Sequence, residues 1–412
     1  MRFGYDASVV GDCASLAEHS SATSHQPPPT PPKSPVVMTV RCSITLLTPP
    51  GRAAIATVRM EGPGAVEAVG RHFIAAAGRP LDHTRTDQLR YGRIGSPPGE
   101  PVVVRVCGPE AVEIHCHGGR AAAAMIEAIF VAEGATPRDW RQWVRDRHGD
   151  RFAADAEIAL AEAPTERTAA ILLDQFHGAL RREWEAVEGA LAQGDAGAAA
   201  ARIDRLRARA PLGRHLVRPW RVVLAGRPNV GKSSLINALV GYARAIVHPR
   251  AGTTRDLLHA AAAFEGWPVE LCDTAGLGTA DGGLEASGMH RARQALAEAD
   301  LVLWILEAGD DQAPPPISGG VAARQVFNKA DLLAPPRRQA AEAPLVSALT
   351  GEGVERLASH VAAWLVPEPP PLGAAVPFTD AQIAALDAAA EFLQRDVIDD
   401  AVRVMRHAGT AH

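Results

Sequence analysis

The stretch GRPNVGKS, residues 226–233, constrains the fold of this chain more than any other feature. It satisfies the pattern G-x-x-x-x-G-K-[ST] and lies between a strand-like run, RVVLA, and a helix-like run. In this pattern the glycines let main-chain amides surround a phosphate, the lysine reaches the phosphate oxygens and the serine hydroxyl can ligate Mg²⁺. The sequence therefore predicts a P-loop domain with a parallel sheet and helices on both of its faces.

Lysine usage points to the same place. Of the 42 basic residues only three are lysines, Lys33, Lys232 and Lys329. The last two lie inside nucleotide motifs, where a compact ammonium rather than a planar guanidinium is required.

A second motif, NKAD at residues 328–331, indicates which base is bound. The Asp331 carboxylate can accept hydrogen bonds from N1 and N2 of guanine, and such bonds contribute roughly 1.5–3 kcal/mol each. Alone, Asp331 could merely cap a helix; with the P-loop upstream and SAL at residues 347–349, it predicts GTP binding. The expected GTP contacts in these motifs are Asn229, Val230, Gly231, Lys232, Ser233, Ser234, Asn328, Lys329, Asp331, Ser347 and Ala348.

Two further motifs supply candidate switch residues. DTAG at residues 273–276 closes the run VELC and contributes Asp273, Thr274, Ala275 and Gly276 as expected contacts around magnesium and the γ-phosphate. GTTRD at residues 252–256 lies where a switch loop places a threonine on Mg²⁺. Thr254 is the first choice and Thr253 stays open. An ordinary turn is the alternative for both motifs.

The residue that orients the attacking water is less clear. Many small GTPases place a glutamine directly after DTAG, but here the chain continues LGTADGG. The nearest carboxylates are Asp281 and Glu285. Glu285 opens a helix-like run from which it could reach the water, and an acidic residue that merely starts a helix is an equal alternative.

The rest of the chain divides by composition. Residues 1–37 are proline-rich and read as a disordered extension, with Met38 as an alternative start. Residues 38–135 alternate strand-like and helix-like runs, which predicts a small α+β domain. Residues 136–217 and 367–412 are helical and flank residues 218–366, so the expected fold is a P-loop domain inserted into a helical domain. Spacings of three and four predict one long helix with one buried face, formed by Leu172, Phe176, Leu180, Trp184, Val187 and Leu191.

Composition excludes several classes of protein. There is no run of about 18 uncharged apolar residues, so no membrane span is expected. The five cysteines are scattered without metal-ligand spacing, which favours a reducing, cytoplasmic setting. A net charge of −5 argues against a uniformly basic nucleic-acid surface. The arginine-rich segment 201–221 is the local candidate for RNA contact, although a solvated helix face is favoured.

With these motifs in place, residues 39–412 resemble the tRNA modification GTPase family called MnmE or TrmE. The resemblance is most specific at TPPGRAAIATVRMEG, at the P-loop, and at AIVHPRAGTTRD, DTAGL, NKAD and SALTGEGV. It implies a GTP-binding domain inserted into a helical domain behind a small dimerising N-terminal domain. It also implies a homodimer whose GTP hydrolysis is activated by potassium and by association of the GTP-binding domains.

The resemblance assigns further residues. It implies that Asn229 ligates K⁺, together with oxygens at His248, Arg250 and Thr253, and that Glu285 is the catalytic glutamate. It implies a tetrahydrofolate one-carbon donor bound near Arg59 and Glu113, for which a surface arginine and a strand-end carboxylate are the alternatives. One departure is that the family ends in a cysteine-containing motif, whereas no cysteine follows Cys272 here.

Three hypotheses remain open from the sequence. The first is a potassium-activated GTPase that drives modification of the tRNA wobble uridine with a flavin-dependent partner protein. The second is a dimerising regulatory GTPase that no longer handles folate or tRNA. The third is a nucleotide-binding scaffold in which Glu285 is inert.

Overall fold

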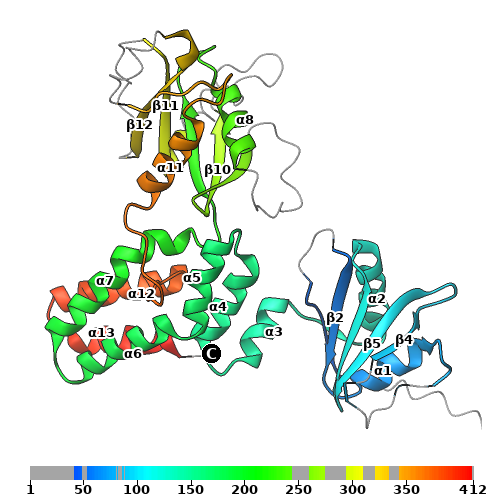
Figure 1. Cartoon of the computed structure of the whole chain (residues 1–412). Coiled ribbons are helices and arrows are strands. Elements are labelled where there is room, and N and C mark those ends of the chain that lie inside the picture. Colours follow the sequence, from blue (N-terminus) through cyan, green and yellow to red (C-terminus); the bar gives the residue numbers. More distant parts are fainter. Residues whose placement is uncertain are drawn as a thin grey trace, which may run out of the picture. The chain divides into compact units, whose positions relative to one another are not determined.

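The computed structural model describes residues 41–48, 53–79, 81, 86–87, 89–243, 259–273, 294–309, 321–333 and 343–410. Within these ranges the chain forms an N-terminal sheet, a group of helices and a second sheet (Figure 1). Each part has its own cluster of buried apolar residues. The group of helices is built from two segments of the chain, one before and one after the second sheet in sequence.

The N-terminal sheet is mostly antiparallel, with the strand order β3-β4-β5-β6-β2-β1-β7. Burial alternates along β2, β5 and β6, so one face carries the core and the other carries polar side chains. The helices α1 (Ala65–His72) and α2 (Arg120–Ala132) contribute to that core. The strands are β1 (Ser43–Leu46), β2 (Ile55–Glu61), β3 (Phe73–Ala75), β4 (Leu89–Ile94), β5 (Glu100–Gly108), β6 (Ala111–His117) and β7 (Thr136–Pro137). This is the α+β organisation that the sequence predicts.

The helical part combines two distant segments of the chain. One cluster of buried residues includes Leu172, Trp184 and Ile203 from the first segment and Leu386 and Met405 from the second. The Trp184 indole Nε1 donates a hydrogen bond to the Met405 carbonyl at 3.1 Å. The helices are α3 (Trp140–Arg147), α4 (Arg151–Glu162), α5 (Glu166–Phe176), α6 (Ala179–Ala192), α7 (Ala196–Arg214), α12 (Asp380–Gln394) and α13 (Ile398–Gly409). The second sheet is thus formed by residues that lie, in sequence, between two segments that fold together.

The expected single long helix through residues 172–191 is wrong. The helix α5 ends at Phe176, and α6 begins at Ala179 after Gly178, whose φ of 89° lies in the left-handed region that favours glycine. The apolar face itself is present on the two helices, because five of its six residues are buried and Phe176 is half-buried.

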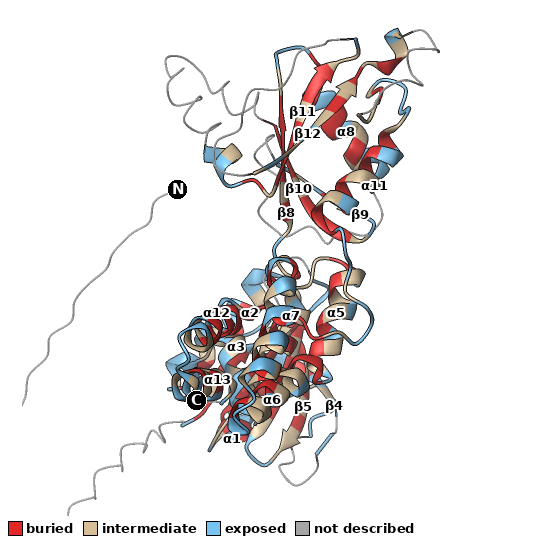
Figure 2. Cartoon of the chain, turned by 90° about the vertical axis from the view of Figure 1, so that its left-hand side faces the viewer, coloured by how far each residue is buried: buried red, intermediate tan, exposed pale blue. Residues whose placement is uncertain are grey.

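The second sheet has the order β12-β11-β8-β10-β9 and is parallel except for the antiparallel edge strand β9. Figure 2 shows buried residues along β10 and β11, as expected for central strands. The helices α8 (Lys232–Tyr242) and α11 (Val354–Leu365) share its main core, and a short 3-10 helix, η2, spans Ala330–Leu332. The strands are β8 (Trp220–Ala225), β9 (His259–Phe264), β10 (Trp267–Asp273), β11 (Leu301–Glu307) and β12 (Ala322–Asn328).

The topology of the second sheet brings the nucleotide motifs to one edge. The strands β8, β10 and β12 run in the same direction, so the residues at their carboxyl ends gather at the same side of the sheet. These ends carry the P-loop, Asp273 and the NKAD motif. None of the helices in the described ranges is both long enough and apolar enough to cross a membrane.

Candidate nucleotide-binding site

The P-loop connects the buried strand β8 to α8, and two of its glycines are sterically required. Gly226 has a φ of 141°, and a Cβ added there would lie 2.3 Å from the Ile305 carbonyl oxygen. Gly231 has a φ of 90°, and a Cβ there would lie 2.4 Å from Nδ2 of Asn328. Any larger residue would therefore displace the loop from the neighbouring strands.

Lys232 begins α8 and is folded back over the P-loop. Its Nζ donates hydrogen bonds to the carbonyls of Gly226 at 3.1 Å and Arg227 at 3.0 Å, and the residue is only 5% exposed. Burial lowers the pKa of the ammonium, against the opposing effect of the Asp273 carboxylate. Charged phosphate oxygens would bind this ammonium better than neutral carbonyls do.

Ser233 and Asp273 join the P-loop to the end of β10. The Ser233 hydroxyl donates a hydrogen bond to the Asp273 carboxylate at 2.5 Å; Asp273 is buried, whereas Ser233 is exposed beside the P-loop. The two side chains present hard oxygen atoms beside the phosphate loop. Such a donor set fits Mg²⁺ better than a soft transition metal.

The NKAD motif is bonded directly to the P-loop and to SAL. Asn328 donates from Nδ2 to the Val230 carbonyl at 2.9 Å and accepts at Oδ1 from the Ala348 amide at 3.0 Å. The Ser347 hydroxyl donates to the Asp331 carboxylate. One asparagine and one serine therefore place three motifs, far apart in sequence, around a common site.

Lys329 forms a turn of the main chain between Asn328 and Asp331. Its φ of 64° is left-handed, and its Nζ forms an ion pair with Glu307 at 2.8 Å. On one side of this turn the Asn328 side chain bonds the P-loop, and on the other side Asp331 lies within the short helix η2. Glu307, at the end of β11, is a positioning residue that the motif search does not reveal.

Comparison with known proteins agrees with this geometry. Residues 221–330 match the family model of the 50S ribosome-binding GTPase. The tRNA modification GTPase MnmE of Thermus thermophilus is 32% identical over 391 residues, covering 86% of this chain and 88% of that protein. A protein of the same name from Chloroflexus aurantiacus is 34% identical over 407 residues, covering 85% and 87%.

The chain belongs to the MnmE family. It is a GTPase, as the sequence predicts. Among solved structures, Aquifex aeolicus Era bound to GDP and aluminium fluoride is 27% identical and covers 41% of this chain and 66% of its own. The TM-score of this match is 0.26.

Part of the expected MnmE-type site lies outside the described residues. This holds for the catalytic candidates Glu285 and Asp281. It also holds for the switch and cation residues His248, Arg250, Thr253, Thr254, Thr274, Ala275 and Gly276. Asn229 is described: it is exposed in the P-loop, with a left-handed φ of 65°.

Arg59 and Glu113, the two residues that the MnmE resemblance places at a folate site, are in contact with each other. Arg59 on β2 faces Glu113 on β6 in register, and Nη1 lies 3.0 Å from the carboxylate. Arg59 also pairs with Glu61 at 2.7 Å, and Glu113 lies 3.3 Å from Arg105. Burial acts to lower the pKa of Arg59, but the bond to Glu61 and the nearby charges raise it overall.

Sequence reasoning missed Glu61 and Arg105. Glu61 lies two residues after Arg59 on the same strand face, and Arg105 lies opposite Glu113 in the ladder. Side chains alternate between the two faces of a strand, so the spacing of two residues from Arg59 could have revealed Glu61. The strand register that places Arg105 is not visible in the sequence. The four side chains form an alternating charge network on one face of the sheet.

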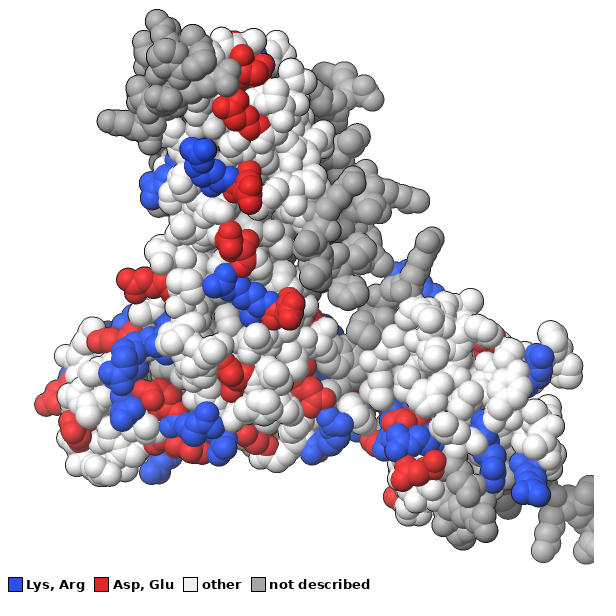
Figure 3. All heavy atoms as spheres, viewed as in Figure 1, with Lys and Arg blue, Asp and Glu red and all other residues white. Residues whose placement is uncertain are grey.

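The arginine-rich segment 201–221 lies mainly on α7 and is largely paired with acids. Arg202 bonds Glu183, and Arg207 bonds Asp387. On the face in Figure 3, acidic and basic side chains are interspersed rather than separated by sign. The pattern fits a solvated helix face.

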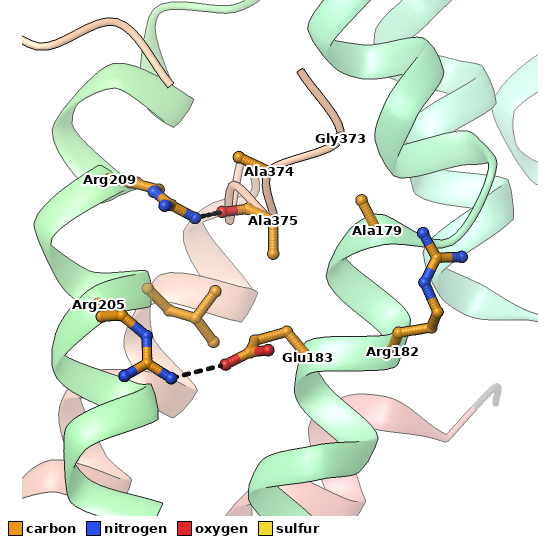
Figure 4. Close-up of a pocket in the computed structure, with 9 residues that line it drawn as sticks. Ala179, Arg182, Glu183, Arg205, Arg209, Gly373, Ala374 and Ala375 are labelled. Atoms are coloured by element: carbon orange, nitrogen blue, oxygen red, sulfur yellow. Dashed lines mark hydrogen bonds and ion pairs between the residues drawn. The ribbon is translucent and has the colours of Figure 1, made fainter. Parts of the chain in front are cut away.

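A cavity of about 380 Å³ opens beside this segment (Figure 4). Arg209 donates to the Ala375 carbonyl at 3.0 Å, and Arg205 lies 3.3 Å from Glu183. Arg182, on the opposite wall, donates to the His177 carbonyl at 2.8 Å. The Arg209 bond ties α7 to the segment that leads into α12, and the Arg205 contact ties α7 to α6.

Proposed function

We propose that this chain is a potassium-activated GTPase that acts in modification of the wobble uridine of tRNA. The observation that carries the proposal is the hydrogen bonding of Asn328 to both Val230 and Ala348, which joins the P-loop to the base-recognition motifs. The family adds the biological context, since relatives that match most of the chain are named tRNA modification GTPases.

The chain's own residues divide the work of nucleotide binding. Lys232 turns from main-chain carbonyls to the β- and γ-phosphate oxygens, and Asp331 accepts hydrogen bonds from the guanine base. Mg²⁺ would be held by the Ser233 hydroxyl oxygen, which Asp273 keeps in place, and by Thr254 or its neighbour Thr253. When bound, the ion would supply positive charge that offsets the negative charge of the phosphates.

Potassium activation rests on the P-loop asparagine. Asn229 is exposed, so its side-chain oxygen is free to reach a cation beside the phosphates, with the oxygens of His248, Arg250 and Thr253 as further ligands. A monovalent cation there would supply the positive charge that an arginine finger supplies in other GTPases. Glu285 orients the attacking water.

The remaining assignments extend the proposal to the whole chain. Residues 38–135 dimerise and bind a tetrahydrofolate derivative near Arg59 and Glu113. Residues 136–217 and 367–412 form the helical domain around the GTP-binding domain at 218–366. A flavin-dependent protein is the partner, and the setting is cytoplasmic.

A complementation experiment tests this function. The chain is expressed in a bacterium that lacks its own MnmE-family gene, and wobble-uridine modification in bulk tRNA is quantified by mass spectrometry. We expect the wild-type chain to restore the modification and Lys232→Ala to abolish it. Unmodified uridine together with normal GTP turnover and no folate binding would favour the regulatory GTPase instead.

A further inference from the structure

We propose that His259, Glu270 and Cys272 form a binding site for Zn²⁺ or a similar thiophilic divalent cation. The antiparallel pairing of β9 with β10 places His259 directly opposite Cys272. Glu270 lies two residues before Cys272 on β10, so its side chain projects from the same face of the sheet. Three chemically different ligand groups therefore meet at one end of the strand pair.

The distances between the ligand atoms suit a single ion. His259 Nδ1 lies 3.0 Å from Cys272 Sγ and 3.7 Å from Glu270 Oε1. One ligand atom from each of the three residues lies within 4.8 Å of the other two. In the described ranges, no other group of three such residues meets this condition.

Zinc geometry requires only small adjustments. Bonds of about 2.3 Å to sulfur and about 2.0–2.1 Å to nitrogen or oxygen place tetrahedral N and S atoms about 3.6 Å apart, and N and O about 3.4 Å apart. The first pair must open by about half an ångström and the second must close by less. Rotation of the partly exposed His259 and Glu270 side chains is enough for both changes.

Glu270 is oriented by a neighbouring arginine. Its Oε2 lies 3.6 Å from Nε of Arg221, while its other oxygen, Oε1, faces His259. Arg221 lies opposite Glu270 in the β8–β10 ladder and is itself held by an ion pair with Glu298. An outer partner that fixes a ligand's orientation in this way is a common feature of metal sites in proteins.

The exposure of the three residues fits a bound ion with one open position. Cys272 is 2% exposed, whereas the His259 and Glu270 side chains are 36% and 34% exposed. An ion can enter from the solvent side and keep one water as its fourth ligand. Binding forms the metal–sulfur bond and releases the thiol proton to solvent, without any oxidant or reductant.

This site is distinct from the expected magnesium site, but the two sites use neighbouring residues of the chain. Cys272 directly precedes Asp273, whose carboxylate holds the Ser233 hydroxyl. The soft sulfur and the imidazole select zinc, cobalt or copper over magnesium, which prefers oxygen ligands. An ion there would clamp β9 to β10 at the end of the strand that carries Asp273.

The test is titration of the nucleotide-free full chain with Co²⁺ in excess Mg²⁺, followed by competition with Zn²⁺. We expect one equivalent of Co²⁺ to produce a thiolate-to-cobalt charge-transfer band that Zn²⁺ removes. Cys272→Val should abolish the band, and His259→Gln should weaken binding at least tenfold. His259 is partly exposed, so this second variant keeps the core intact.

Cys116→Val is the matched control, because Cys116 is equally buried but lies in the N-terminal sheet. It should leave the band and the affinity unchanged. The proposal is overturned if wild type gives no thiolate band, or if the band persists in Cys272→Val.

Discussion

The Asn328 side chain donates a hydrogen bond of 2.9 Å to the carbonyl of Val230, 98 residues earlier in the chain. The bond ties the base-recognition motif to the P-loop, so the guanine end and the phosphate end of the site are one structural unit. Because the same amide also accepts from Ala348, its loss would loosen three loops at once.

Replacing Asn328 with alanine should weaken GTP binding by about 10- to 100-fold. A buried hydrogen-bonding group left without its partner costs about 1–3 kcal/mol, and here two main-chain groups lose their partner. Fluorescent GTP-analogue titration measures the effect. Arg324→Ala, an exposed change on the same strand, is the control and should bind normally; equal affinity in both variants would remove Asn328 from the site.

Asp331→Asn should change base preference rather than abolish nucleotide binding. The carboxylate accepts hydrogen bonds from N1 and N2 of guanine, and losing the charge weakens GTP binding by roughly 10- to 100-fold. Xanthosine triphosphate carries an oxygen at the position of the guanine amino group, to which an asparagine amide can donate. Competition binding should show its affinity rising in the variant. Unchanged GTP affinity would mean that Asp331 serves only a structural role, through its hydrogen bond with Ser347.

Leu386→Ala should destabilise the helical part by about 2–5 kcal/mol, the usual cost of a large-to-small change in a core. Leu386 is fully buried on α12 and belongs to the cluster shared with α5, α6 and α7. Urea unfolding followed by circular dichroism measures the loss. Leu372→Ala is the same substitution at a residue that is 96% exposed, and it should change stability little. Equal stability of the two variants would show that the flanking segments do not share a core.

The Cys272 thiol should be protonated and unreactive at neutral pH in protein freed of metal by a chelator. Burial, with a smaller contribution from Glu270, raises the pKa of this thiol from 9.0 to about 12. The folded state holds the thiol proton up to a higher pH than the unfolded state does. The free energy of unfolding therefore has its full value below pH 9 and falls as the pH rises from about 9 to about 12. Wild type should therefore lose stability relative to Cys272→Val across that window, as measured by urea unfolding at each pH.

The motifs that the sequence reveals without any knowledge of the fold are the local ones, and the structure brings them together. The P-loop, NKAD and Asp273 each lie within a few consecutive residues, and strand direction alone brings them to one edge of the sheet. Sequence reasoning missed what depends on strand register or on a turn. Examples are the alanine-rich edge strand β9, the break at Gly178 and the pairing of Arg105 with Glu113.

The His259–Cys272 pair was missed for the same reason. The two residues are separated by 13 positions, a spacing that matches no metal-binding pattern, and they meet only because β9 turns back along β10. Cross-strand neighbours of this kind follow from the length of a hairpin and from its register. A scan for closely spaced ligands does not find them.

The most direct test of the central claim is the initial rate of GTP hydrolysis in KCl and in NaCl at equal ionic strength. Wild type, Asn229→Ala and Glu285→Ala are compared at saturating GTP with Mg²⁺. We expect much faster turnover in potassium for wild type, loss of that difference in Asn229→Ala, and loss of turnover with retained GTP binding in Glu285→Ala. Equal, slow rates in both salts for the wild-type chain would contradict the claim.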